Sequence, residues 1–130
     1  RMRSDLLRNI MTLHYNNISK VEGLKYKYFL EILKLHNNII SKIEGIASLK
    51  NLLTLNLNNN KIKKIEGLSS CSNLQVLDLS KNNITRIEGL SVPTLQTINL
   101  KNNKISLSKI RKAQKEYPHI KIWLPLKFKV

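Results

Sequence analysis

The sequence repeats itself every 22 residues, and this period constrains the fold more than any other feature. Near copies of one ten-residue stretch stand at 15–24, 37–46, 59–68 and 81–90. Each copy holds an asparagine in the same place, and the spacings of 22, 22, 22 and 21 residues connect Asn16, Asn38, Asn60, Asn82 and Asn103. A fixed period of this length is typical of a solenoid, in which a repeat buries its apolar side only against its neighbours.

Aliphatic residues recur at fixed places around each asparagine. Leucine stands three residues before it in all five copies, and isoleucine stands two residues after it. In 74–80, Leu77 and Leu79 alternate with polar neighbours, which predicts a short strand with one buried face. We therefore expect the α/β class, as a solenoid with a parallel sheet on its concave side and short helical or irregular segments on its convex side.

The recurring asparagines meet a need of the backbone. Where the chain leaves each strand and turns into the interior, buried N–H and C=O groups require partners. An amide side chain supplies an acceptor and two donors, so the five asparagines are expected to form a ladder inside the solenoid. The glycines of a second recurring position predict a sharp bend with positive φ or tight packing: Gly23, Gly45, Gly67 and Gly89.

The whole unit reads L-x-x-L-x-L-x-x-N-x-I-x-x-I-E-G-L over about residues 8–107, and it resembles the leucine-rich repeat. Its length and its I-x-x-I-E-G-L half resemble the Sds22-like group, named after a regulator of phosphatase-1. The resemblance implies a non-catalytic scaffold or adaptor that binds a protein partner, as phosphatase regulators and ciliary or dynein-associated proteins do. It also implies a eukaryotic, cytoplasmic protein associated in some cases with the cytoskeleton or cilium, with bacterial internalins as a lesser alternative.

The two ends depart from the repeat. At the N-terminus, Ser4 or Asp5 would cap a single helical turn, and Arg8 stands where later repeats have leucine. We expect a single domain over 1–130, with a longer parent protein as the alternative. At the C-terminus, 108–130 is expected to form a cap.

The C-terminal cap is predicted as a helix followed by a strand. Helical spacing connects Ile110, Ala113 and Tyr117, and Ser108 and Pro118 are the expected N-cap and stop of this helix. In the strand that follows, the inward positions are expected to be Ile120, Ile122 and Leu124.

Three isolated features have a structural and a functional interpretation. Trp123 is expected to pack over the last repeat rather than to anchor a partner. The single cysteine, Cys71, stands where the previous repeat has Leu49, so it is expected to be a small core side chain. Stacking places His14 beside His36, which we interpret as two partly exposed polar residues rather than a metal site.

The outward positions of the strands are the predicted partner-binding face. They lie two, four and six residues before each asparagine and vary between repeats, whereas the inward positions keep one residue type. The predicted contacts are Thr12, His14, Ile32, Lys34, His36, Asn56, Asn58, Asp78, Ser80, Asn99 and Lys101. No nucleotide-binding, metalloprotease or nucleophile-elbow motif occurs, so we expect no enzyme, cofactor or metal.

The formal charge of +15 opens an alternative function. Such a charge attracts RNA and other polyanions, although aromatic residues for base stacking are few. The predicted polyanion contacts are Lys109, Arg111, Lys112, Lys115 and Lys121, together with Lys127 and Lys129. No apolar run approaches the roughly 18 residues of a membrane span, and we expect a monomer with no membrane contact.

Overall fold

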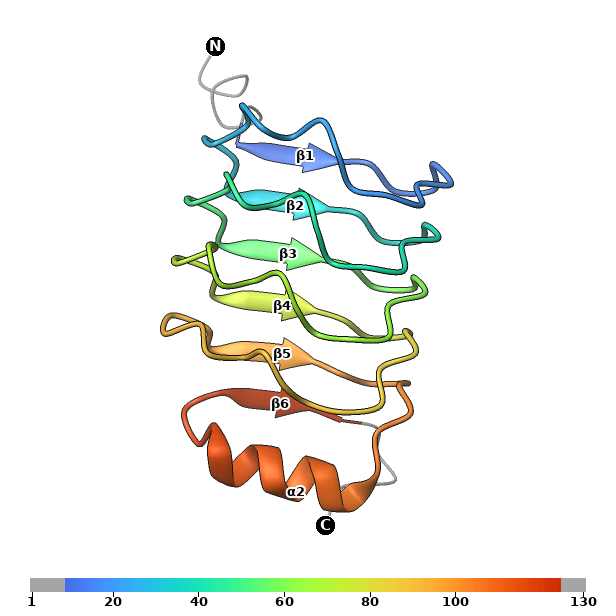
Figure 1. Ribbon diagram of the computed structural model, residues 1–130, viewed down its shortest axis with the longest axis vertical. Coiled ribbons are helices and arrows are strands. Elements are labelled where there is room, and N and C mark those ends of the chain that lie inside the picture. The colour runs from blue at the N-terminus through green and yellow to red at the C-terminus, as the bar shows by residue number, and fades with distance from the viewer. Residues whose placement is uncertain (1–8, 125–130) are drawn as a thin grey trace.

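The computed structural model describes residues 9–124 as a stack of parallel rungs (Figure 1). The predicted N-terminal capping turn and the contacts at Lys127 and Lys129 lie outside these residues. The strands form one six-stranded parallel sheet in sequence order. The element bounds are β1 (Ile10–Thr12), β2 (Ile32–Lys34), β3 (Thr54–Asn56), β4 (Val76–Asp78), β5 (Thr97–Asn99), α2 (Leu107–Glu116) and β6 (Lys121–Trp123).

Equivalent residues of successive repeats pair in register, as the 22-residue period predicts. Leu55 of β3, for example, pairs with Leu33 before it and Leu77 after it. The central residue of each strand from β2 to β5 points into the solenoid and is buried. Together with the isoleucines and leucines of the returning segments, these side chains form one continuous aliphatic core. Burial of this core supplies the main stabilisation of the stack.

The returning segments between strands consist of turns and bends, and within residues 9–124 the one regular helix is α2. All four glycines have positive φ, between 68° and 80°. A Cβ atom on Gly45 would overlap the carbonyl oxygen of Val21 in the preceding repeat, whereas one on Gly23 would meet nothing. The recurring glycine therefore permits both the bend and the close approach of neighbouring repeats.

The asparagine ladder is confirmed in the interior of the stack. The Oδ1 atom of Asn60 accepts the backbone N–H of Ile40 at 3.0 Å. Its Nδ2 atom donates to the carbonyls of Leu35 and Leu57, at 3.0 and 3.1 Å. Asn38, Asn82 and Asn103 make equivalent bonds. Each amide therefore joins the backbone of two successive repeats.

Asn16 does not take part in the ladder as the other four do. Its side chain is exposed, and its Nδ2 atom donates to the carbonyl of His14 in its own repeat. Its backbone N–H donates to Oδ1 of Asn38. The expectation of five buried amides was therefore wrong at this end, because no earlier repeat within the described residues presents backbone groups to Asn16.

A second strained position accompanies the ladder. The residue before each of the five recurring asparagines has a φ between 56° and 59°, the left-handed region, and these residues are Tyr15, Asn37, Asn59, Lys81 and Asn102. Asparagine tolerates this conformation better than most residues, which explains the Asn-Asn pairs at 37–38, 59–60 and 102–103. This position was not identified from the sequence, although these recurring pairs were its signal.

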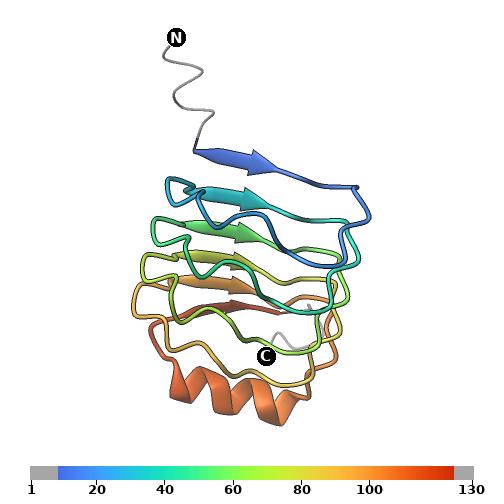
Figure 2. The same ribbon diagram turned by 45° about the horizontal axis from the view of Figure 1, so that its top comes forward.

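The C-terminal cap closes the stack with α2 and then β6 (Figure 2). The predicted N-cap at Ser108 was wrong. Ser106 is the N-cap, with extended backbone, and its Oγ accepts from Lys109 N at 3.5 Å. Ser108 therefore lies inside the first helical turn. Ile110 and Ala113 are buried and Tyr117 is the C-cap, and β6 pairs in parallel with β5.

The inward positions of the cap agree with the sequence prediction. Ile120 is buried and belongs to the core, and Ile122 and Leu124 pack against it. Cys71 is also a buried core side chain, as predicted.

Candidate functional site

The predicted binding positions lie on one face of the sheet, in three columns that run from repeat to repeat. The strand register gives the first two columns. The first column contains Ile10, Ile32, Thr54, Val76, Thr97 and Lys121. The second column contains Thr12, Lys34, Asn56, Asp78, Asn99 and Trp123. The third column, two residues further on, contains His14, His36, Asn58, Ser80 and Lys101. We call this surface the concave face. The strand register places the first two columns on one face, and the contact of this face with a partner stays a prediction.

The second column has a structural role that the sequence analysis missed. Asn56, Asp78 and Asn99 each accept, through Oδ1, the backbone N–H of the residue two positions later, at 3.0, 3.0 and 3.1 Å. This side-chain-to-backbone bond stabilises the turn out of the strand. These three residues are therefore fixed in orientation, and one acceptor atom of each is already occupied.

A polar network lies at the centre of the concave face. Ser80 Oγ donates to Asp78 Oδ1 at 2.6 Å, and Asn58 Nδ2 donates to Ser80 Oγ at the same distance. Asp78 is the single carboxylate in the three columns. The Oδ1 atom of this carboxylate is occupied by Ser80, while its charge still acts on His36.

The two histidines stack at the N-terminal end of the concave face, as predicted. Their ring centroids lie 4.9 Å apart and their planes differ by 3°. Burial, together with the charges of His14 and Lys34, lowers the pKa of His36, while Asp78 acts in the opposite direction. The Nδ1 atom of His36 is buried without a hydrogen-bond partner. Within residues 9–124, no three His, Cys, Asp or Glu side chains gather as a metal site would require.

Trp123 occupies the other end of the concave face. It pairs with Asn99 and remains 42% exposed, so the expectation that it packs over the last repeat was wrong. Since Ile122 takes the inward position of β6, its neighbour has to point outward. The ammonium groups of Lys101 and Lys121 lie 5.4 and 4.3 Å from the centroid of its ring.

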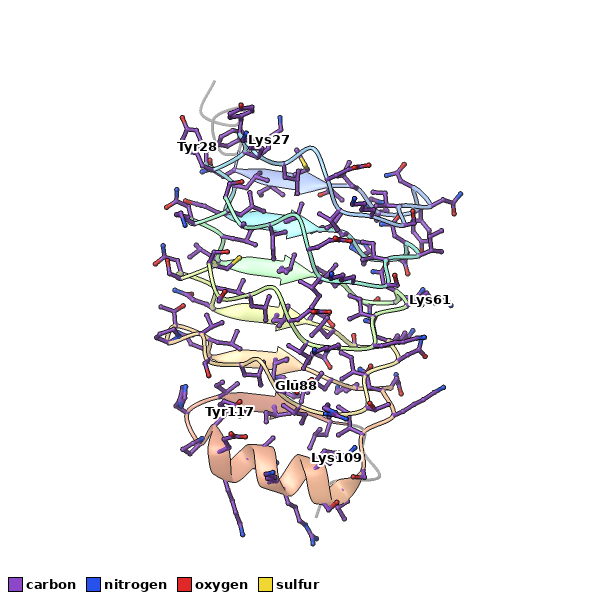
Figure 3. All side chains as sticks on the ribbon, viewed as in Figure 1. Lys27, Tyr28, Lys61, Glu88, Lys109 and Tyr117 are labelled. Atoms are coloured by element: carbon purple, nitrogen blue, oxygen red, sulfur yellow. The ribbon has the colours of Figure 1, made fainter. Side chains whose placement is uncertain are left out.

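The predicted polyanion contacts fall into two groups. Lys109, Arg111, Lys112 and Lys115 are exposed on α2, whereas Lys121 lies beside Trp123 on the concave face. A hollow of about 370 Å³ lies between α2 and the returning segment of the fourth repeat, and the residues that line it include Arg86, Glu88, Lys109, Lys112, Glu116 and Tyr117. Figure 3 labels Glu88, Lys109 and Tyr117 around this hollow. Lys109 Nζ donates to the carbonyl of Thr85 at 3.3 Å.

A group of exposed aromatic residues near β1 was not identified from the sequence. Tyr26, Tyr28 and Phe29 are 76%, 62% and 40% exposed, and the last two meet edge to face. Lys27, labelled with Tyr28 in Figure 3, stands where later repeats bury Leu49 and Cys71. The signal was the departure of this stretch from the repeat pattern.

The stacked strands, the asparagine ladder and the open concave face define a leucine-rich repeat protein. The family model "Leucine Rich repeats (2 copies)" matches residues 28–70 and 72–112. The chain therefore belongs to the leucine-rich repeat family. A comparison with curated proteins gave no match, and no helix within the described residues is long and apolar enough to cross a membrane.

Solved structures share this fold. A chain of the TLR13–ssRNA13 complex is 32% identical with a TM-score of 0.73, covering 87% of this chain and 17% of its own length. A chain of the Drosophila melanogaster SNF/U2A′ complex is 26% identical with a TM-score of 0.77, and the match covers 85% of this chain and 69% of that one. Internalin C2 of Listeria monocytogenes is 35% identical with a TM-score of 0.64, and the match covers 77% of this chain and 46% of the internalin.

Proposed function

We propose that this protein is a non-catalytic scaffold that binds a protein partner through the concave face. The observation that carries the proposal is the contrast between the two sides of the sheet. Inward positions keep aliphatic residues because packing dictates them, whereas the outward columns range over histidine, lysine, amide, carboxylate and tryptophan. Variation among the outward residues is what a specific recognition surface requires.

The dimensions of the concave face agree with this role. Six strands at about 4.8 Å spacing give a surface about 24 Å long, and an interface of standard size buries about 800 Å² on each partner. The named complex of U2A′ with SNF supports a protein partner for a chain of this fold. The same proposal includes membership of the Sds22-like subgroup, a cytoplasmic location with cytoskeletal or ciliary association, and a monomeric state. These parts of the proposal rest on the repeat sequence.

This proposal is tested by partner capture with two variants. Each variant carries one added arginine, either on the concave face or on a returning segment. Thr54 lies at the centre of the concave face in β3, and Ser69 is exposed on a returning segment. A Thr54→Arg variant is expected to lose the proteins that the unmodified chain retains from an extract of its source cell, whereas Ser69→Arg retains them. Equal retention by both variants, at equal melting temperatures, would place the binding site elsewhere.

A second candidate function is binding of RNA or another polyanion by the cap. The favouring observation is the gathering of Arg86, Lys109 and Lys112 around one hollow, next to the exposed Arg111 and Lys115. The named TLR13–ssRNA13 complex supports this class of ligand. Affinity for a single-stranded RNA oligonucleotide should then fall by about a hundredfold or more between about 50 and 200 mM salt. A salt-independent affinity, or none at low salt, would exclude it.

A further inference from the structure

Positive charge exceeds negative charge on the concave face, because Asp78 is the one carboxylate beside Lys34, Lys101 and Lys121. The Oδ1 atoms of Asn56, Asp78 and Asn99 accept backbone N–H groups, and the hydroxyl of Ser80 both donates and accepts within the central network. The ammonium groups of Lys34, Lys101 and Lys121 remain as donors. A ligand that matches this face therefore brings acceptors and negative charge.

The donors concentrate at the C-terminal end, in a site that we call the Trp123 corner and define as Lys101, Lys121 and Trp123. Both ammonium groups lie within 5.4 Å of the indole centroid, and the indole is 42% exposed. Asp78 lies in β4, two strands away from β6, and is already bonded to Ser80. The corner therefore combines two positive charges with an open aromatic surface.

We propose that the Trp123 corner binds carboxylate side chains of an acidic, extended protein segment. Carboxylates beside the ammonium groups of Lys101 and Lys121 would form charge-assisted hydrogen bonds, which are stronger than bonds between neutral groups. The neighbouring methylene groups of the ligand would pack on Trp123, the residue type most enriched among binding hot spots. This inference rests on the proposed function, because it names the chemistry of the partner of the same concave face.

The geometry favours carboxylates over the phosphates and bases of a nucleic acid. Binding of single-stranded nucleic acid uses a series of aromatic side chains on which successive bases stack. Here the chain offers a single indole, Trp123. The other aromatic rings of the three columns, His14 and His36, belong to the first two repeats, about 20 Å away by the strand spacing, and they stack on each other.

The test uses the fluorescence of Trp123, the single tryptophan of the chain. The probes are a 15-residue peptide of alternating serine and glutamate, the same peptide with glutamine for glutamate, and an oligouridylate of equal charge, at about 0.15 M salt. We expect a saturable change in emission with the glutamate peptide and none with the glutamine peptide. A double variant, Lys101→Gln with Lys121→Gln, should weaken that binding by about tenfold or more.

The matched control removes the same amount of charge from the first two repeats. A double variant of Lys20→Gln with Lys42→Gln should keep the affinity of the unmodified chain within about twofold, because those side chains are exposed on returning segments far from the corner. Three results would overturn the inference: equal binding of the glutamine peptide, equal weakening by both double variants, or tighter binding of the oligouridylate.

Partner capture separates this inference from the proposed function. If Thr54→Arg loses the partner and the Lys101/Lys121 double variant retains it, the concave face binds a protein and the Trp123 corner does not contribute. If Thr54→Arg also retains the partner, both the proposed function and the inference are wrong. Circular dichroism of each variant confirms that the sheet is intact.

Discussion

The imidazole of His36 stacks on that of His14, with ring centroids 4.9 Å apart and planes within 3° of parallel. The register of β1 and β2 imposes this contact, because both residues follow their strands at the same position. Burial, His14 and Lys34 disfavour the charged form of His36, with Asp78 as the opposing charge, so the pKa of His36 is lowered. The surroundings of His36 therefore favour its neutral imidazole.

This stack predicts a loss of stability in mild acid. Burial, with His14 and Lys34, lowers the pKa of His36 from its ordinary value of 6.5, so the unfolded chain binds the proton more readily than the folded chain. The contribution of His36 to the free energy of unfolding is therefore fully present above pH 6.5. This contribution decreases as the pH falls from 6.5 through the pKa of the folded state. The check is the urea midpoint between about pH 8 and pH 5.

Two histidine variants isolate this effect. His36→Gln should reduce the decrease in midpoint, whereas His119→Gln, in an exposed position before β6, should leave it as in the unmodified chain. If the decrease is unchanged in His36→Gln, other groups cause it.

The thiol of Cys71 should be inert in the folded protein. Its side chain is fully buried, and burial raises the pKa of the thiol, with Lys50 acting in the opposite direction. The thiolate is the reactive form, so alkylation by iodoacetamide should be at least about a hundredfold slower in the native state than in denaturant. Mass spectrometry follows the modification. A native rate close to the denatured rate would show that the third repeat opens readily.

The repeat pattern was sufficient to predict the sheet, its register and the amide ladder, which is buried at Asn38, Asn60 and Asn82 and half-buried at Asn103. These follow from two strict periods, the alternation of a strand and the 22-residue unit. The left-handed position before each ladder asparagine was missed, because Tyr15 and Lys81 there do not resemble the asparagines of the other repeats. Backbone strain at a recurring place is visible only when φ is known.

The ends were predicted less well than the repeats. Ser106 and Ser108 are equal candidates as N-caps by residue type, and the extended backbone of Ser106 decides between them. Ile122 was assigned to the inward face of the cap strand, and the alternation of side chains along a strand then requires the indole of Trp123 to point outward. The prediction for Trp123 gave more weight to the size of the indole than to this alternation. The approach of Lys101 and Lys121 to the indole of Trp123 depends on the register of the cap strand, which the repeat period does not specify.

Asn60→Leu should destabilise the protein by about 1 to 3 kcal/mol. The substitution leaves the buried N–H of Ile40 without its acceptor, and a buried unpaired group costs about 1 to 3 kcal/mol. The carbonyls of Leu35 and Leu57 lose this amide but still accept from Asn38 and Asn82. Urea unfolding measures the change. Asn16→Leu is the matched control, because this side chain is exposed and its loss should cost less than about 1 kcal/mol. Equal effects of the two variants would contradict the ladder.

Gly45→Ala should destabilise the protein more than Gly23→Ala, although both glycines have positive φ, of 74° and 80°. The backbone conformation costs an alanine about 1 to 2 kcal/mol at either position. At Gly45 the added Cβ also overlaps the carbonyl oxygen of Val21, whereas at Gly23 it meets nothing within 4 Å. Relief of that overlap requires the first two repeats to separate, which should add at least about 1 kcal/mol.

The difference in free energy of unfolding between these two glycine variants measures how rigidly the repeats are spaced. The cost of the backbone conformation is common to both variants, so it cancels in this difference. Thermal and urea unfolding should both give a lower midpoint for Gly45→Ala. Indistinguishable midpoints would mean that neighbouring repeats move apart at little cost. A concave face built on such a stack would not hold the two ammonium groups and the indole of the Trp123 corner in a fixed arrangement, so rigid spacing is a requirement of that site as well as of the fold.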